Sequence, residues 1–65
     1  MSTPKVVLIT GAARRVGAEM ARFLHAQGMH VILHYRSSQQ AAQQLCEALN
    51  QERHDSAAML QADLH

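Results

Sequence analysis

The 65-residue sequence lacks the crosslinks that usually stabilise a very small protein. Its one cysteine, Cys46, excludes an internal disulfide, and no cysteine–histidine spacing typical of zinc is present. A chain of this size buries only about 60% of the surface that its unfolded form exposes, so its stability is marginal. We therefore expect one domain at most. A single unpaired cysteine also favours a reducing compartment, and we expect the protein to be cytoplasmic.

Other scarce features exclude further classes of protein. Aromatic residues make up 3% of the chain, and the longest apolar run, residues 6–9, is far shorter than the roughly 20 residues of a membrane span. Residues 1–5 lead directly into that run, without the longer apolar region of a signal peptide. The formal net charge of +1 does not indicate a nucleic-acid surface. A 48% hydrophobic content indicates a soluble globular fold, with neither membrane nor nucleic acid as a partner.

The apolar pattern alternates between strand and helix along the chain. Three segments have the character of strands: residues 5–10, 29–35 and 57–62. Two segments have helical spacing: residues 16–27 and 39–53. The first strand is a continuous apolar run between Pro4 and Gly11, which suits a strand buried on both faces. The order β-α-β-α-β predicts an α/β fold with a three-stranded parallel sheet in the order 3-2-1, a partial doubly wound (Rossmann) fold.

Each expected helix has an apolar stripe that should face the core. In the first helix the stripe is Val16, Met20, Phe23 and Leu24. In the second it is Ala42, Leu45, Cys46 and Leu49. Gly28 suits the position after a helix end, and Ser38 could cap the second helix. In the order 3-2-1, strand one has no neighbour on its outer side and should be an exposed apolar edge. The two helices should cover only one face of the sheet. We therefore expect the isolated chain to be unstable, self-associating or stabilised by a partner.

The first strand leads into a turn bounded by two glycines, Gly11 and Gly17. Glycine lets the chain turn tightly and lets backbone N–H groups approach a phosphate at the start of a helix. Arg14 and Arg15 lie within this turn and could bind phosphate oxygens; their alternative role is that of solvated surface side chains. The predicted phosphate-binding residues of this turn are Gly11, Arg14, Arg15, Val16 and Gly17.

The end of the second strand should choose between NAD and NADP. An acidic residue there binds the ribose hydroxyls of NAD, whereas a cation accommodates the 2′-phosphate of NADP. No acidic residue occurs between Glu19 and Glu47, and Arg36 supplies the cation. The predicted binding residues of this segment are His34, Tyr35, Arg36, Ser37 and Ser38. The pattern favours NADP(H), although a polar turn with a helix cap would look similar.

Asp63 and a pair of histidines are the remaining candidate ligands in the sequence. Asp63, after the third strand, lies at the carboxyl edge where open α/β sheets bind ligands, and it could also be a simple turn residue. His30 and His34 could share a strand face, but four residues of strand span about 13 Å, too far for one metal ion. No metal site is expected. Gln39 stands four residues after Tyr35, so the chain has no Tyr-x-x-x-Lys pair and no catalytic residue is assigned to it.

With these segments placed, the sequence resembles the short-chain dehydrogenase/reductase family over nearly its whole length. Thr10-Gly11 and Gly17 match the outer positions of that family's Thr-Gly-x-x-x-Gly-x-Gly motif, with Arg15 in place of the middle glycine. That arginine, the segment 34–38 and the segment 61–64 are similar to the pteridine reductase branch.

The resemblance implies NADPH-dependent reduction of pterin rings of the biopterin or folate type, usually by a tetramer. It places Arg15 near the pyrophosphate, Arg36, Ser37 and Ser38 at the 2′-phosphate, and Asp63 with the Leu64 backbone at the adenine. The family's catalytic residues lie beyond residue 65, so residues 1–65 are expected to be the N-terminal NADP-binding part of a domain and inactive alone. The alternatives are another NADP-dependent reductase, such as a 3-oxoacyl-carrier-protein reductase, and a non-catalytic nucleotide-binding module.

Overall fold

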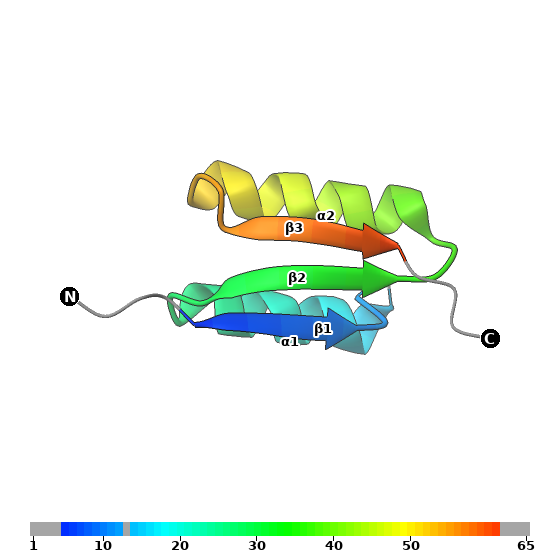
Figure 1. Cartoon of the computed structure of the whole chain (residues 1–65), viewed down its shortest axis with the longest axis horizontal. Coiled ribbons are helices and arrows are strands. Elements are labelled where there is room, and N and C mark those ends of the chain that lie inside the picture. The colour runs from blue at the N-terminus through cyan, green and yellow to red at the C-terminus, as the bar shows by residue number, and fades with distance from the viewer. Residues whose placement is uncertain (1–4, 13, 62–65) are drawn as a thin grey trace.

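The computed structural model describes residues 5–12 and 14–61. Strands and helices alternate along the chain: β1 (Val6–Thr10), α1 (Arg15–Ala26), β2 (His30–Tyr35), α2 (Gln39–Glu52) and β3 (Ala57–Gln61). The three strands are parallel and lie in the order β1-β2-β3. This arrangement, shown in Figure 1, confirms the predicted partial Rossmann fold and the position of β2 at the centre of the sheet.

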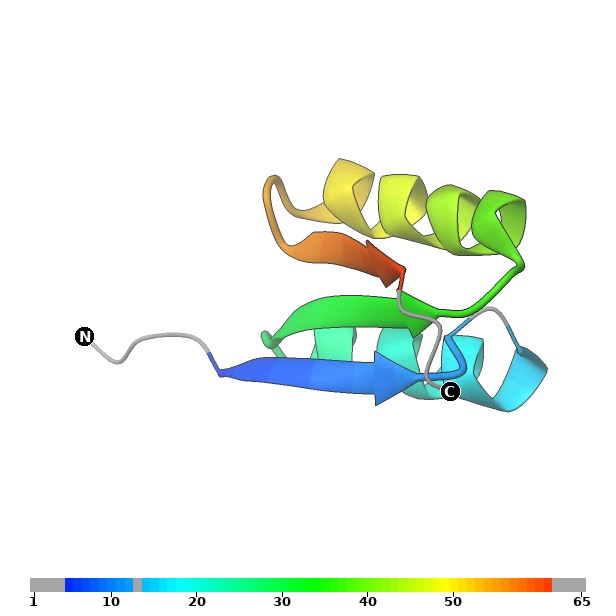
Figure 2. The same ribbon diagram turned by 45° about the vertical axis from the view of Figure 1, so that its right-hand side comes forward.

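Burial alternates along β2, and this alternation explains how the helices and the sheet form two layers. Val31, Leu33 and Tyr35 are buried, whereas the residues between them are only partly buried. Successive side chains of a strand point to opposite faces, so one face of β2 meets the helices and the other does not. Figures 1 and 2 show α1 and α2 on the same face of the sheet. The expected one-sided coverage is therefore confirmed.

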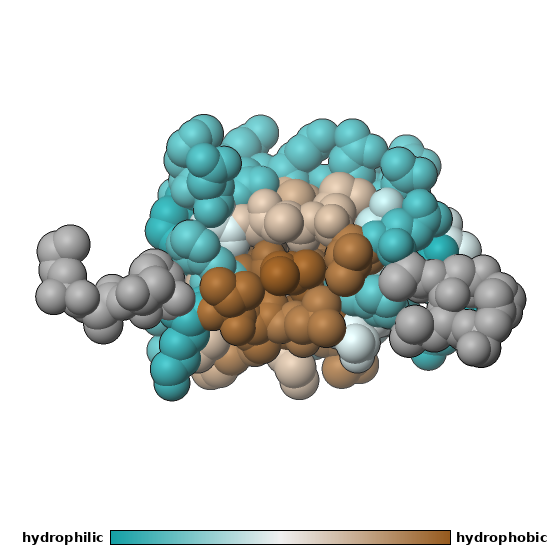
Figure 3. Space-filling view, in the orientation of Figure 1, coloured by the Kyte–Doolittle hydropathy of each residue, from teal (hydrophilic) through white to brown (hydrophobic). Residues whose placement is uncertain are grey.

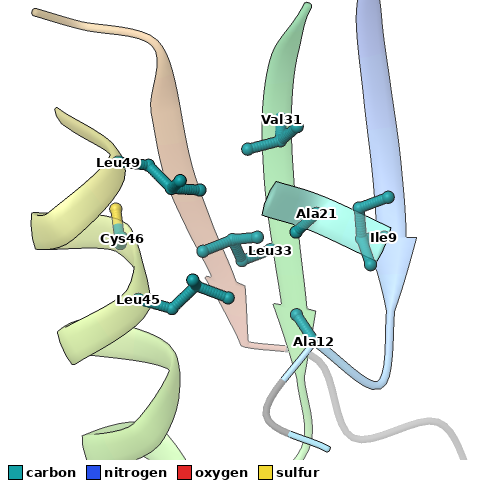
Figure 4. Close-up of a cluster of buried hydrophobic side chains, with 8 residues drawn as sticks. All are labelled: Ile9, Ala12, Ala21, Val31, Leu33, Leu45, Cys46 and Leu49. Atoms are coloured by element: carbon teal, nitrogen blue, oxygen red, sulfur yellow. The ribbon is translucent and has the colours of Figure 1, made fainter. Parts of the chain in front are cut away.

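The core lies between this face and the two helices (Figure 4). Its buried apolar residues are Ile9, Ala12, Ala21, Val31, Leu33, Leu45, Cys46 and Leu49. The predicted apolar face of α2 is confirmed, since Ala42, Leu45, Cys46 and Leu49 are all buried. Cys46 is one of these small buried side chains, in agreement with the prediction.

The predicted apolar stripe of α1 is wrong as a core face for three of its four residues, and only Leu24 is partly buried and packs against the core. Val16, Met20 and Phe23 are 73%, 53% and 64% exposed, whereas Ala21 and His25 are buried. Phe23 lies about 200° around the helix axis from Ala21, at roughly 100° per residue. The helix therefore has two apolar sides, and the side with the smaller residues packs on the sheet because it allows the backbones to approach closely.

The face of the sheet opposite the helices is apolar and open. Val6 and Leu8 of β1 are 61% and 52% exposed, so the expectation of a strand buried on both faces is wrong for this chain. Leu60 of β3 is exposed on the same face. The surface over the strands is strongly hydrophobic, with hydrophilic residues around it (Figure 3). Within the described residues, neither helix combines the length and the hydropathy needed to cross a bilayer.

The two helices begin and end within one residue of the predicted bounds, and only the start of α2 at Gln39 matches them fully. Gly28 follows α1 with φ +95°, and its N–H bonds to His25 O while Met29 N–H bonds to Leu24 O. These two bonds satisfy free carbonyl groups at the helix end, as expected for a glycine in this position. Ser38 occupies the N-cap position of α2, but its side chain makes no capping hydrogen bond.

Candidate functional site

The candidate site lies at the carboxyl edge of the sheet. The parallel register places Thr10 beside His34, and His34 beside Leu60. Figures 1 and 2 show the β1–α1 turn and the β2–α2 connection at this same edge. The backbone N–H of Ala12 donates to His34 O at 3.1 Å, which joins the two predicted binding segments directly. Gln61 Nε2 donates to Arg36 O at 3.5 Å and joins the third strand to them.

The β1–α1 turn is tight, and glycine is required at both of its ends. Gly11 has φ +65°, a left-handed conformation that other residues rarely adopt, and its carbonyl accepts a hydrogen bond from Arg14 N–H at 2.9 Å. A Cβ on Gly17 would lie 2.3 Å from Gly11 O. The helix therefore presses against the turn, and only glycine permits this contact at residue 17.

The turn is shorter than the sequence predicted. Helix α1 begins at Arg15, with Arg14 at its N-cap, so Arg15, Val16 and Gly17 form the first helical turn rather than part of a loop. The first N–H groups of a helix have no partner within it. No side chain caps α1, and its first turn contains no acidic residue.

This helix end is suited to an anion. Arg14 and Arg15 are exposed beside it. The ion pair of Arg15 with Glu19 has a length of 3.8 Å between side chains that are 93% and 68% exposed, so it is worth at most about 1 kcal/mol and does not hold the guanidinium in place. A hollow of about 480 Å³ adjoins the turn; its lining includes Thr10, Gly11, Arg14 and Gly17. Free N–H groups, the helix dipole and nearby cations together favour a phosphate.

The residues at the tip of β2 differ in their exposure to solvent. Arg36, Ser37 and Ser38 are exposed. Ser37 and Ser38 line a hollow of about 540 Å³ at the start of α2, together with residues of the first helical turns. Tyr35 is only 6% exposed and lies on the helix side of the sheet, so its side chain contributes to the core. His34 lies on the other face, and its buried Nδ1 has no hydrogen-bond partner among the described residues.

A dinucleotide, the group that the sequence suggested, needs hydrogen-bond donors for its phosphates and polar partners at this edge of the sheet. The start of α1 has no side-chain cap, and the buried Nδ1 of His34 has no hydrogen-bond partner among the described residues. These observations fit a ligand that carries phosphate and polar groups at the carboxyl edge. Within residues 5–12 and 14–61, no three histidine, cysteine, aspartate or glutamate side chains form a group that could hold a metal ion.

Two of the predicted site residues cannot be placed, and two contacts at the site were not predicted. Asp63 and Leu64 lie outside the described residues. Ala12 and Gln61 were not singled out as site residues, although they connect the binding segments, Ala12 through its backbone N–H and Gln61 through its side-chain amide. The only sequence signal for Ala12 was its position directly after Gly11. Its hydrogen bond follows from the path of the turn, which a one-dimensional pattern does not reveal.

Comparison with known proteins finds relatives that are named as reductases, oxidoreductases or dehydrogenases. The chain is 48% identical over 62 residues to pteridine reductase 1 of Leishmania tarentolae, covering 95% of this chain and 22% of that protein. It is 43% identical over 60 residues to an uncharacterised oxidoreductase of Bacillus subtilis, covering 92% of this chain and 25% of the relative. It is 40% identical over 60 residues to 3beta-hydroxysteroid dehydrogenase 1 of Eggerthella lenta, covering 92% and 23%.

The chain thus spans about a quarter of the length of these relatives or less. Within that span the match is nearly continuous. The family model described as short chain dehydrogenase matches residues 5–65, which include β1, the glycine turn and the tip of β2. The chain belongs to the short-chain dehydrogenase family, a family of oxidoreductases.

Proposed function

We propose that residues 1–65 are the N-terminal NADP(H)-binding part of an NADPH-dependent short-chain reductase. The observation that carries the choice of NADP(H) is Arg36 at the tip of β2, with no acidic residue between Glu19 and Glu47. The family binds nicotinamide dinucleotides, and a cation at this tip suits the 2′-phosphate, whereas the ribose hydroxyls of NAD call for a carboxylate.

Each candidate residue then has a separate role. The N–H groups at the start of α1 would receive the pyrophosphate, with Arg14 and Arg15 as nearby cations. Arg36 and the hydroxyls of Ser37 and Ser38 would bind the 2′-phosphate. Gly11 and Gly17 keep the turn tight enough for the backbone to reach the phosphates. His34 and Tyr35 would contribute mainly the backbone at the tip of β2, while Asp63 and Leu64 would meet the adenine.

The bound cofactor would supply hydride, and this chain would bind and orient it. Its only tyrosine, Tyr35, is buried in the core and has Gln39 four residues later. A Tyr-x-x-x-Lys pair of the kind that the family uses is therefore not formed from Tyr35. We propose that the 65 residues alone are inactive and that the catalytic groups belong to a later part of the same domain.

A pterin is the substrate class that we propose for the whole enzyme. Arg15 stands where the family's middle glycine is expected, and pteridine reductase 1 of Leishmania tarentolae is among the relatives. A cytoplasmic tetramer is the proposed state of that enzyme. The Eggerthella lenta relative is named for a steroid substrate, so an assay should include alternatives to pterins.

The choice of cofactor is tested by comparing Arg36→Ala with Arg22→Ala, which removes an exposed cation from α1 at a distance from the tip of β2. We expect Arg36→Ala to weaken NADPH binding about 10- to 100-fold, because a charge-assisted hydrogen bond contributes about 1.5–3 kcal/mol, and to change NADH binding little. Arg22→Ala should change neither affinity. Equal losses for NADPH and NADH in Arg36→Ala would contradict the proposal.

The substrate is tested with the full-length enzyme. NADPH oxidation should be faster with dihydrobiopterin than with an acetoacetyl thioester, and the 65-residue chain should oxidise NADPH with neither. Preference for the thioester would favour a 3-oxoacyl-carrier-protein reductase. A stop codon directly after residue 65, together with NADPH binding, would favour a non-catalytic module instead.

A further inference from the structure

A polar side chain stands on the core-facing side of β3, at the end of the strand nearest the candidate site. Ala57 and Met59 are partly buried and pack against the core. Because alternate residues of a strand share a face, Gln61 belongs to the same side, where the pattern of β3 calls for another apolar residue. The parallel register pairs Gln61 with Tyr35, which is buried on that side of the sheet. An amide therefore lies directly beside the last residue of β2.

The path of the chain after β2 explains what this amide contacts. Helix α2 lies over the covered face, so residues 36–38 must cross from the edge of the sheet to that face (Figures 1 and 2). The crossing brings the backbone carbonyl of Arg36 next to Gln61, whose Nε2 lies 3.5 Å from Arg36 O. A carbonyl oxygen only accepts hydrogen bonds, so the amide nitrogen must be the atom that faces it.

The tip of β2 is held from both of its neighbours in the sheet. On the side of β1, Ala12 N–H donates to His34 O at 3.1 Å. On the side of β3, Gln61 donates to Arg36 O. Residues 36–38 are exposed and lie between the end of β2 and the start of α2, outside both elements. The backbone position of Arg36 therefore depends on side-chain contacts of this kind as well as on the sheet.

We propose that Gln61 is a positioning residue for the 2′-phosphate of NADP(H), which acts by fixing the backbone of Arg36. The proposal rests on the proposed function, in which the Arg36 guanidinium binds that phosphate. An arginine side chain loses much conformational freedom when it binds, and a backbone that is already held in place lowers this cost. The hydrogen bond is long and exposed, so it should affect cofactor selection more than folding.

The role is tested by Gln61→Met in the full-length enzyme, with NADPH and NADH affinities measured by fluorescence titration. Methionine has a similar length but cannot donate a hydrogen bond. We expect NADPH binding to weaken roughly 3- to 10-fold, the range of one hydrogen bond, and NADH binding to change little, because NADH has no 2′-phosphate. Gln51→Met is the matched control, since Gln51 is exposed near the C-terminal end of α2, and it should change neither affinity.

A double substitution separates positioning from direct contact with the cofactor. If Gln61 acts through Arg36, Gln61→Met should cause hardly any further loss of NADPH affinity in an Arg36→Ala background. Additive losses would mean that Gln61 acts independently of Arg36, and they would overturn the positioning role. Gln61→Leu continues the apolar pattern of β3. It should lose as much NADPH affinity as Gln61→Met, with an unfolding midpoint close to that of the parent enzyme.

The proposed function and the role of Gln61 fail in different ways. The preference of the parent enzyme for NADPH, and its loss in Arg36→Ala, test the proposed function without any change at Gln61. If both are observed and Gln61→Met keeps the parent ratio of NADPH to NADH affinity, the positioning role is overturned while the proposed function stands. A parent enzyme that binds NADPH and NADH equally would overturn both.

Discussion

The backbone N–H of Ala12 donates to the carbonyl oxygen of His34 at 3.1 Å, so the glycine turn and the tip of β2 are directly joined. Ala12 is fully buried, and the turn is therefore part of the core as well as part of the candidate site. Changes in this turn should affect both stability and nucleotide binding. Changes at the opposite edge should affect stability alone.

Gly17→Ala tests whether the close contact within the turn is needed for nucleotide binding. Alanine in place of glycine usually stabilises a helix by about 1 kcal/mol, but here the new Cβ would lie 2.3 Å from Gly11 O. We expect the turn to shift, with at least about a tenfold loss of NADPH affinity, equivalent to about 1.4 kcal/mol. Titration of the chain with NADPH measures this loss.

Gly28→Ala is the control for this substitution. Gly28 has φ +95° and no atom within 4 Å of a new Cβ, so alanine there adds backbone strain without a collision. It should lower stability by about 1 kcal/mol and leave NADPH affinity unchanged, because Gly28 lies at the other end of α1. Equal NADPH affinities of the two variants would show that the close contact of the turn is not needed for binding.

Asn50 should be important for stability because it satisfies three backbone groups at the start of β3. Its Oδ1 accepts from Ser56 N–H at 2.9 Å and from Ala57 N–H at 2.8 Å, and its Nδ2 donates to Ala57 O at 3.0 Å. Asn50→Ala leaves these groups without their partner. We expect the free energy of unfolding to fall by about 2–3 kcal/mol, measured by urea denaturation.

Gln43→Ala provides the comparison on the same helix. Gln43 Nε2 donates to Glu47 Oε1 at 3.2 Å on the exposed side of α2, an interaction worth about 0.2–0.5 kcal/mol. Its loss should hardly change the urea midpoint. If Asn50→Ala were equally mild, the amide contacts to β3 would contribute little to stability.

The open apolar surface should cause the isolated chain to self-associate. Leu8 is exposed on the uncovered face of the sheet, and Phe23 is exposed on the outer side of α1. Exposed apolar surface commonly mediates association. Leu8→Lys and Phe23→Glu should each reduce the mass observed by sedimentation equilibrium, and the more effective variant identifies the surface involved.

Ala26→Glu, an exposed position on α1, adds the same charge as Phe23→Glu without removing a large apolar side chain. It should leave association nearly unchanged. A parent chain that stays monomeric at all concentrations, with a sharp and reversible unfolding transition, would contradict this expectation.

Cys46 should react slowly with alkylating reagents. Burial raises the pKa of its thiol, Glu47 raises it further, and the hydrogen bond from Asn50 lowers it. Each unit by which the pKa is raised reduces the thiolate fraction about tenfold, so iodoacetamide should react faster with the unfolded chain than with the folded one.

The same shift predicts a pH effect on stability. Because the folded-state pKa is above the unfolded value of 9.0, the unfolded thiol loses its proton first, and stability should fall as the pH rises above about 9. Cys46→Ala should remove this part of the pH dependence. Equal alkylation rates in buffer and in urea would show that the thiol is accessible in the folded chain.

Local patterns predicted the order of the elements and placed their ends within one residue of the observed bounds. Gly28, which adopts φ +95°, and the buried stripe of α2 could be read directly, since each depends on the properties of single residues or on helical spacing. The face of α1 could not be read in this way. Two sets of apolar residues fit the spacing, and only packing on the sheet selects Ala21 and His25 over Val16, Met20 and Phe23.

The candidate site also combines features that could be predicted from the sequence with contacts that could not. By itself, the sequence determined the glycines at 11 and 17, the cations at 14, 15 and 36, and the lack of an acid near the tip of β2, because composition at a position requires no knowledge of the fold. The tertiary structure alone decided that Ala12 bonds to His34 and that His25 meets Ser56, 31 residues away. Those contacts arise from the parallel crossovers, which bring distant backbone segments to one edge, and no local pattern encodes them.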